Sequence, residues 1–333
     1  MYGKKVLRVY STKEEFHKSE SFASVVKRLG NPESTTLIHS SCHVFRIPQV
    51  DGVVGYHQIG NCAVVIGDPI CLSHDTPKLT NAFHFHCQKR GLSTVYLTVH
   101  HDFAHWAIHN GCQTLIQIGS ELSINPTHFR LKHKLRNQMN QSLKHAVQVK
   151  EYTHFDPLLE SQMKNTLEIW SKQRRGVQIH LGNNNYFYND IKKRIFYAQQ
   201  KDTIIGFLVL TPLDRFQGWV VNTHLAILEA PAGTKEHLMC TVFNSLAQEK
   251  CHFLCLGAIS GTQLGEVIGL NSFDKTLASL IFKVAKWFFK LDAKATHLKK
   301  YRPNLQPTFL VCSGKLTIIE LLAIKNALNV KVW

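Results

Sequence analysis

Two cations flank a tyrosine in the motif Lys300-Tyr301-Arg302-Pro303, near the end of the chain. Lysine and arginine side chains bind phosphate and carbonyl oxygens, so the motif suits a phosphate-containing or acyl substrate. If the segment is extended, Lys300 and Arg302 point to opposite sides, and one can face a cleft while the other faces solvent. Ordinary surface charge is the alternative explanation.

A second set of cations lies in the stretch His128 to Val149, which we predict to be one long basic helix. Arg130 and Lys134 are four residues apart, and so are Lys132 and Arg136. On a helix this spacing makes two adjacent cationic stripes that can follow a phosphate backbone. A solvated helix face is the alternative.

The stretch Leu277 to Leu291, just before the first motif, has the period of an amphipathic helix. Its lysines mostly project away from the apolar face. Such a helix can meet an anionic surface, either lipid headgroups or a nucleic-acid backbone. A core helix with solvated lysines is the alternative.

Metal chemistry is disfavoured by the sequence. His101, His105 and His109 recur every four residues on a predicted helix, a spacing that can bind zinc. Nothing in the sequence supplies partners to orient such ligands, and Trp106 and Ile108 indicate a packed helix. We therefore predict no metal. The nine cysteines are scattered through apolar runs, which indicates reduced and buried thiols.

The composition indicates a globular protein with an anionic partner. Of 333 residues, 44% are hydrophobic, and 39 lysines and arginines against 23 acids give a formal net charge of +16. The excess is spread along the chain, which favours RNA or an anionic membrane as the partner. Because no signal peptide or long apolar run is present, we expect a cytoplasmic location, peripheral at the inner face of the cytoplasmic membrane if the substrate is a lipid.

Alternating helical and strand patterns predict a mixed α/β (α+β) fold. A strand meander from Cys42 to Ile66 is followed by helix–strand units up to Ile118, and a second α/β pattern begins at Pro157. The two halves share an order of elements. We therefore predict two similar domains, 1–127 and 151–333, joined by the basic helix at 128–150, with the reaction cleft in the second domain.

Five blocks recur in a characteristic order over about residues 40–312. They are Gly52 to His57 with Cys62 to Pro69, His128 to Asn137, Glu236-His237-Leu238-Met239, Phe253 to Ala258, and Lys300-Tyr301-Arg302-Pro303 with Pro307 and Phe309-Leu310. Together they resemble the C-terminal catalytic domain of the phosphatidylglycerol lysyltransferases, the aminoacyl-lipid synthases. No block is specific alone, but their order and spacing are.

This resemblance implies two GCN5-acetyltransferase-like domains in tandem. It also implies transfer of an aminoacyl group from tRNA to a lipid hydroxyl such as that of phosphatidylglycerol. The partners would be aminoacyl-tRNA and an anionic phospholipid or membrane surface, with no cofactor. The implied residues are Lys300 and Glu236 for catalysis, His237, Gly257, Arg302 and Tyr301 for substrate binding, and Arg130, Lys132, Lys134 and Arg136 for tRNA binding.

Three departures from the family's pattern bear on specificity. The family's acid before Leu-Met is His237 here, with Glu236 beside it, and the following arginine is Cys240. The family's Trp-Glu-Pro-Arg ends here in Thr308. Since an acidic pocket suits a cationic aminoacyl side chain, the loss of a charge predicts a neutral or small group such as alanine. A catalytically silent relative that binds RNA or membrane is one alternative.

A second alternative is an acyl-coenzyme A-dependent N-acyltransferase of the same fold. Acetyltransferases of this fold bind the pyrophosphate of coenzyme A at a glycine-rich turn between a strand and a helix. The corresponding turn here, Glu229 to Thr234, has only Gly233, and Pro231 lacks an N–H. The turn therefore argues mildly against coenzyme A.

Overall fold

The computed structural model describes residues 9–10, 20–38, 40–173, 192–261, 263–271 and 291–328, with the backbone alone at 9–10 and 291–294. The expected amphipathic helix Leu277 to Leu291 lies outside these residues, apart from its last position.

The first part of the chain alternates short helices with strands, as its sequence pattern predicts. Gly60, with φ of +55°, makes the tight turn between the antiparallel strands β3 and β4. In chain order the elements are β1 (Val9–Tyr10), α1 (Phe22–Leu29), η1 (Glu33–Leu37), β2 (His43–Phe45), β3 (Gly52–Ile59), β4 (Cys62–Ile66), β5 (Ile70–Cys71), η2 (Ser73–Asp75), α2 (Thr76–Lys89), β6 (Ser93–His100), α3 (His101–His109), β7 (Thr114–Ile124) and η3 (Pro126–His128).

The second part repeats the alternation with longer strands. Its elements are α4 (His133–Lys144), β8 (Val147–Tyr152), α5 (Pro157–Gln173), β9 (Arg194–Gln200), β10 (Thr203–Leu213), η4 (Asp214–Phe216), β11 (Gly218–Ala226), α6 (Thr234–Gln248), β12 (Leu254–Ser260), β13 (Val267–Ile268), α8 (Leu291–Lys299), β14 (Asn304–Cys312) and α9 (Ile318–Ala327).

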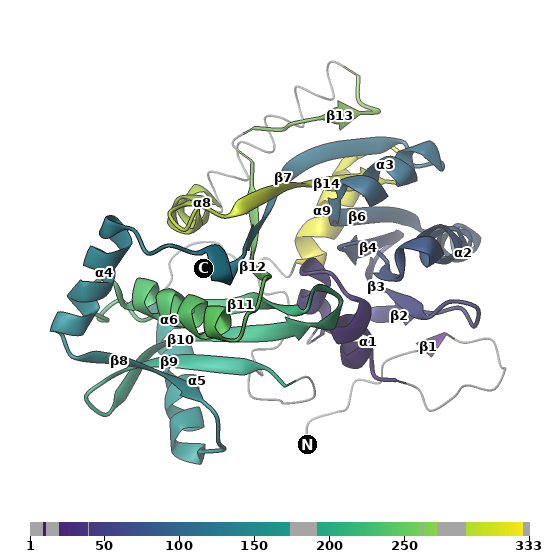
Figure 1. Cartoon of the computed structure of the whole chain (residues 1–333). Coiled ribbons are helices and arrows are strands. Elements are labelled where there is room, and N and C mark those ends of the chain that lie inside the picture. The colour runs from purple at the N-terminus through teal and green to yellow at the C-terminus, as the bar shows by residue number, and fades with distance from the viewer. Residues whose placement is uncertain are drawn as a thin grey trace.

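The described strands form one open mixed sheet, in the order β1-β2-β3-β4-β6-β14-β7-β12-β11-β10-β9-β8, with β5 and β13 attached beside it (Figure 1). The late strand β14 is inserted between β6 and β7, which come from the first part of the chain. The parallel pair β11–β12 is joined at Trp219–Leu254 and Val220–Cys255, and β12 pairs with β7 along its other edge from Leu254 to Ser260. The mixed α/β class is confirmed, while the division into 1–127 and 151–333 stays a prediction.

Helices cover both faces of the sheet, and the period of the strands explains how. In β10, Leu208 and Leu210 pack in the cluster that includes Val242 of α6, whereas Phe207 and Val209 pack with Met163 of α5. Alternate residues of a strand point to opposite faces, so both sets must be apolar. This is why Thr203–Leu213 reads as a nearly continuous apolar run.

Two expected helices are shorter in the structure. The helix expected over residues 11–30 begins at Phe22, where the Ser21 side chain caps it by accepting from the Ser24 N–H; residues 11–19 lie outside the described part. The long basic helix at 128–150 is wrong: α4 covers only His133–Lys144 and β8 starts at Val147. None of the described helices has the length and apolar character needed to cross a membrane.

Candidate active site

The two residues predicted to be catalytic meet in the structure. Glu236 lies in the first turn of α6, and Lys300 directly follows α8. The Lys300 ammonium forms an ion pair with the carboxylate of Glu236, whose side chain is 10% exposed. The N-terminal turn of a helix stabilises negative charge, so α6 supports the carboxylate as well.

His297 completes this cluster, one helical turn before Lys300. Its Nδ1 lies 3.1 Å from the Lys300 Nζ and 4.0 Å from the Glu236 Oε1. Burial and the charge of Lys300 lower the pKa of His297 to about 4, so its ring is neutral at pH 7. Because the ammonium of Lys300 can only donate, Nδ1 accepts and the ring hydrogen sits on Nε2. No described residue accepts a hydrogen bond from this buried Nε2.

Charge balance keeps Glu236 and Lys300 paired. Burial alone would raise the pKa of Glu236, but the hydrogen bond and charge of Lys300 outweigh it and lower that pKa. Burial also lowers the pKa of Lys300, opposed by the bond to Glu236. We conclude that the carboxylate is ionised at neutral pH and that the pair is a fixed internal dipole.

Tyr301 is buried beside the pair, at 3% exposure. Its ring meets Phe243 of α6 edge-on at a centroid distance of 5.5 Å, and the Lys300 Nζ lies 5.1 Å from the Tyr301 centroid. The phenol oxygen is buried without a hydrogen-bond partner in the described structure. Tyr301 O–H and His297 Nε2–H are thus two buried donors without a hydrogen-bond partner among the described residues.

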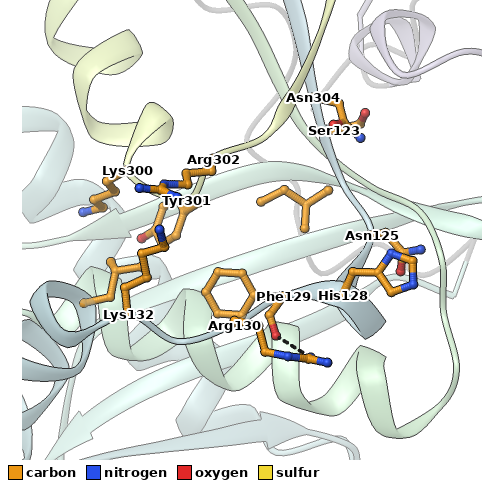
Figure 2. A pocket seen from close by; sticks show the side chains of 12 residues that line it. Ser123, Asn125, His128, Phe129, Arg130, Lys132, Lys300, Tyr301, Arg302 and Asn304 are labelled. Carbon is orange, nitrogen blue, oxygen red and sulfur yellow. Dashed lines mark hydrogen bonds between the residues drawn. The ribbon is translucent and has the colours of Figure 1, made fainter.

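A cavity of about 310 Å³ opens beside these residues. Its cationic lining residues are Arg130, Lys132, Lys300 and Arg302, and none of the residues lining it is acidic. Figure 2 shows that they come from two segments, the chain before α4 and the turn after α8. The cavity therefore suits an anionic ligand. Its lining residues are Ser123, Ile124, Asn125, His128, Phe129, Arg130, Lys132, Leu135, Lys300, Tyr301, Arg302 and Asn304.

The segment around Arg302 is a turn, so the extended conformation expected there is wrong. The Tyr301 N–H donates to the Leu298 carbonyl at 3.1 Å, and the Arg302 N–H to the Lys299 carbonyl at 2.9 Å. Arg302 is exposed and has φ of +56°, the left-handed region. As a result Lys300 and Arg302 line the same cavity instead of pointing to opposite sides.

The two cationic stripes expected on one helix are also wrong. Arg130 and Lys132 precede α4, which starts at His133, while Lys134 and Arg136 lie on it. All four side chains are exposed. Phe129 and Leu131 alternate with the first two cations and pack against the core, which holds this stretch extended. Arg130 and Lys132 thus belong to the cavity, and Lys134 and Arg136 to the neighbouring helix surface.

His237 points toward α4, and its Nδ1 lies 2.9 Å from the Ser142 Oγ. Ser142 Oγ donates to the Met139 carbonyl, so it accepts from His237. Gly257 has φ of +93° at an irregularity in the pairing of β12 with β7. Neither residue lines the cavity that contains Lys300. Their predicted roles in substrate binding stay predictions.

Two further histidines were not identified from the sequence. His297 precedes Lys300 by three residues on a helix, a spacing that places both side chains on one face and could have revealed it. His224 of β11 has its ring centroid 5.8 Å from that of His297, and its Nε2 donates to the Lys235 carbonyl. Nothing in the local sequence of β11 indicates this contact.

The chain belongs to the phosphatidylglycerol lysyltransferase family. The sequence model of that family, described as phosphatidylglycerol lysyltransferase, C-terminal, matches residues 24–312. No curated protein sequence matches the chain.

Solved structures share the fold. L-PGS from Bacillus licheniformis is similar with a TM-score of 0.76 and 15% identity, covering 95% of this chain and 98% of that one. The C-terminal domain of a candidate lysylphosphatidylglycerol synthetase from Agrobacterium fabrum is similar with a TM-score of 0.74 and 15% identity, covering 89% and 92%. At these identities the likeness concerns the fold, and the family assignment supports a transferase.

Proposed function

We propose that the chain transfers an aminoacyl group from aminoacyl-tRNA to a hydroxyl of phosphatidylglycerol or a related anionic lipid. The observation that carries this proposal is the cationic cavity that ends at the Lys300–Glu236 pair. Membership of the phosphatidylglycerol lysyltransferase family supports the acceptor class. Such an enzyme would work at the inner face of the cytoplasmic membrane.

Binding of both substrates would rest on phosphate contacts. The tRNA end and the lipid headgroup each carry phosphate, and Arg130, Lys132 and Arg302 supply exposed cations around the cavity. Arginine pairs with phosphate oxygens through two parallel hydrogen bonds. Lys134 and Arg136 extend the positive surface along α4, where the tRNA backbone could continue.

The reaction requires the protein mainly to position the two substrates and to stabilise negative charge on the carbonyl oxygen. The lipid hydroxyl attacks the aminoacyl carbonyl carbon, the ester bond to the tRNA ribose breaks, and the hydroxyl proton ends on the ribose oxygen. The carbonyl oxygen gains negative charge on the way, and the Lys300 ammonium, at the wall of the cavity, can donate to it. Glu236 holds the Lys300 ammonium in place. Holding the two substrates together supplies the remaining acceleration.

The amino acid transferred is expected to be neutral or small. Glu236 is the acid nearest to the family's acidic position, and its charge is already balanced by Lys300. No acid lines the described cavity, so a lysyl ammonium would lack a partner there. Alanine is the simplest candidate.

The coenzyme A alternative is weakened by the packing at the start of α6. Gly233, with φ of +87°, is the residue before the helix, and a Cβ placed there would lie 1.8 Å from the Gln138 carbonyl oxygen of α4. A carbonyl oxygen thus lies against the turn where a pyrophosphate would need N–H groups. The other alternative, a catalytically silent relative that binds RNA or membrane, rests on the departures at His237, Cys240 and Thr308. A transfer assay distinguishes it from an active enzyme.

The test is transfer by the purified protein. It is incubated with total aminoacylated tRNA and vesicles of phosphatidylglycerol and phosphatidylcholine, and lipids are analysed by mass spectrometry. We expect an aminoacyl-phosphatidylglycerol, absent in Lys300→Met and kept in the matched control Lys299→Met, which removes the exposed neighbouring lysine. Acyl transfer from acyl-coenzyme A alone would favour the first alternative. Vesicle or tRNA binding without any transfer would favour the silent relative.

A further inference from the structure

A second polar cluster lies away from the cavity, in the first part of the chain. His100 ends β6 and Asp68 follows β4, and these parallel neighbours end at the same edge of the sheet. Glu121 comes from β7 and Glu33 from the 3₁₀ helix η1. Glu33 and Glu121 are 7% and 3% exposed, so two carboxyl groups are buried around one histidine.

Hydrogen bonds fix the orientation of the His100 ring. Its Nδ1 lies 2.9 Å from the Asp68 Oδ2, and its backbone N–H donates to the Asp68 Oδ1 at 2.9 Å. Asp68 therefore selects the tautomer with hydrogen on Nδ1 and turns Nε2 inward. Nε2 lies 3.2 Å from the Glu121 Oε2 and 3.8 Å from the Glu33 Oε2.

A single hydrogen on Nε2 cannot form hydrogen bonds to both Glu33 and Glu121. Hydrogen bonds from the ring to both Asp68 and Glu121 require a hydrogen on each ring nitrogen. The single N–H reaches Glu121 and leaves the buried Glu33 Oε2 with no hydrogen-bond partner in the described structure. A buried, unpaired carboxyl oxygen aimed at a histidine and a second carboxylate indicates a missing cation.

We propose that Glu33, His100 Nε2 and Glu121 bind one divalent transition-metal ion, with Asp68 orienting the histidine. One ligand atom from each residue, a carboxylate oxygen of Glu33 and Glu121 and a ring nitrogen of His100, lies within 4.8 Å of the other two. Zinc bonds of about 2.0–2.2 Å bring tetrahedral neighbours to about 3.3–3.6 Å, which small side-chain rotations would reach. One imidazole and two carboxylates suit zinc, iron or manganese better than magnesium or calcium.

The hydrogen bond on the other side of the ring supports this choice. A ligand histidine usually donates its other ring N–H to a carboxylate, which is the bond that His100 makes to Asp68. Three protein ligands leave a position for water, as in open metal sites. On binding, the metal replaces the hydrogen on Nε2, so at least one proton is released. The expectation from sequence that no metal binds would then be wrong.

The candidate histidines on α3 are not part of this site. The His109 Nδ1 lies 2.7 Å from the His105 carbonyl oxygen, and the His105 Nε2 lies 3.2 Å from the Glu266 Oε2. With 20 histidines in the chain, weak surface binding of zinc is expected and must be separated from the proposed site.

The test uses the full chain, stripped of metal and titrated with zinc or manganese in a calorimeter. We expect each chain to bind one metal ion tightly and to release protons as it does so. Proton release is detected because the measured heat of binding then changes with the ionisation heat of the buffer. Glu33→Gln and Glu121→Gln should lose the site. Asp68→Asn should weaken binding by about 10–100-fold. His105→Asn is the matched control on α3 and should bind as the unmodified chain does.

Cobalt gives a second readout, because its visible spectrum reports nitrogen and oxygen ligation, and zinc should raise the melting temperature only where the site is intact. If Glu33→Gln and Glu121→Gln fail to fold, the proposal is tested by whether Asp68→Asn binds the metal more weakly than the unmodified chain. Equal affinity in the unmodified chain, Asp68→Asn and Glu121→Gln would overturn the proposal. So would the absence of a strong equivalent, or loss of binding in His105→Asn alone.

Discussion

Lys300 and Glu236 form an ion pair across 64 residues of sequence, and the pair joins the turn after α8 to the first turn of α6. Both side chains are largely buried, at 19% and 10% exposure. A buried pair contributes little net stability, but removing one partner leaves an uncompensated charge. The pair therefore fixes where the Lys300 ammonium stands at the wall of the cavity.

Single and double variants of the ion pair should distinguish its effect on unfolding free energy from its effect on aminoacyl transfer. Lys300→Met leaves Glu236 buried and unpaired, and we expect it to cost at most about 3–5 kcal/mol of unfolding free energy, measured by urea denaturation. The double variant Lys300→Met/Glu236→Gln should recover most of that stability and still transfer no aminoacyl group. Transfer at the unmodified rate by the double variant would show that Lys300 has no part in the reaction.

The cations before α4 should matter more than those on it. Arg130→Glu/Lys132→Glu changes the cavity lining, whereas Lys134→Glu/Arg136→Glu changes only the helix surface. We expect both pairs to weaken tRNA binding. For each phosphate that a variant no longer neutralises, the slope of log affinity against log salt should fall by about 0.7–0.9. Only the first pair should also reduce transfer at saturating tRNA.

Lys144→Glu is the matched control, since it reverses one charge at the far end of the same helix. It should leave both tRNA affinity and transfer close to those of the unmodified chain. If it weakens binding as much as either pair does, the effect comes from net charge and the cavity has no special role.

The period of apolar residues predicts most of the elements. The helix His101–His109 is as expected, and β6, α5, α6 and β10 differ from expectation only at their ends. The error at 128–150 arises because basic composition does not by itself specify a helix. Phe129 and Leu131 alternate with two cations, and that period of two indicates an extended segment.

The candidate site depends on long-range contacts that periodicity does not encode. Lys300 and Glu236 are predicted because their motifs resemble those of a family, and their pairing is visible only in the fold. His297 and His224 belong to no motif, so the sequence does not single them out. The Glu33–His100 contact joins a 3₁₀ helix to a strand end and has no signal in local spacing.

Gly233 should tolerate alanine poorly. Its φ of +87° costs a side chain about 1 kcal/mol, and the added Cβ would meet the Gln138 carbonyl oxygen. Gly91→Ala is the control, because Gly91 has φ of +64° with open space around it. We expect Gly233→Ala to lose clearly more unfolding free energy than Gly91→Ala. Equal losses would mean that α4 does not pack against the start of α6.

Acid should weaken the fold through two partly buried histidines, His224 and His297. Burial lowers the pKa of His224 to about 3, and burial with the charge of Lys300 lowers that of His297 to about 4. Below about pH 6.5 these histidines bind protons in the unfolded chain but not in the folded chain. The free energy of unfolding therefore falls as the pH drops toward 4. Each histidine adds at most about 1.4 kcal/mol per pH unit to this slope.

His224→Gln keeps a donor for the Lys235 carbonyl but cannot titrate, so it should remove up to one proton from the slope between pH 6.5 and 4. Unfolding by urea at several pH values measures this. A slope unchanged by the variant would show that His224 titrates alike in the folded and unfolded chain.

Substitutions of His237 distinguish two hypotheses, in which this residue either selects the transferred amino acid or only packs against α4. If it occupies the family's acidic position in the aminoacyl pocket, His237→Asp should shift transfer toward lysyl-tRNA. The structure directs its ring to Ser142 of α4, outside the described cavity. We therefore expect His237→Asp to lower the melting temperature, because the donor to Ser142 is removed, and to leave the ratio of lysyl to alanyl transfer unchanged.

His237→Asn is the control, since its amide can still donate to the Ser142 Oγ without adding charge. It should keep both the melting temperature and the transfer ratio. A shift toward lysyl transfer in His237→Asp but not in His237→Asn would place the aminoacyl side chain between α4 and α6. Glu236 would then serve only to hold Lys300, and the specificity of the enzyme would depend on the residue beside it.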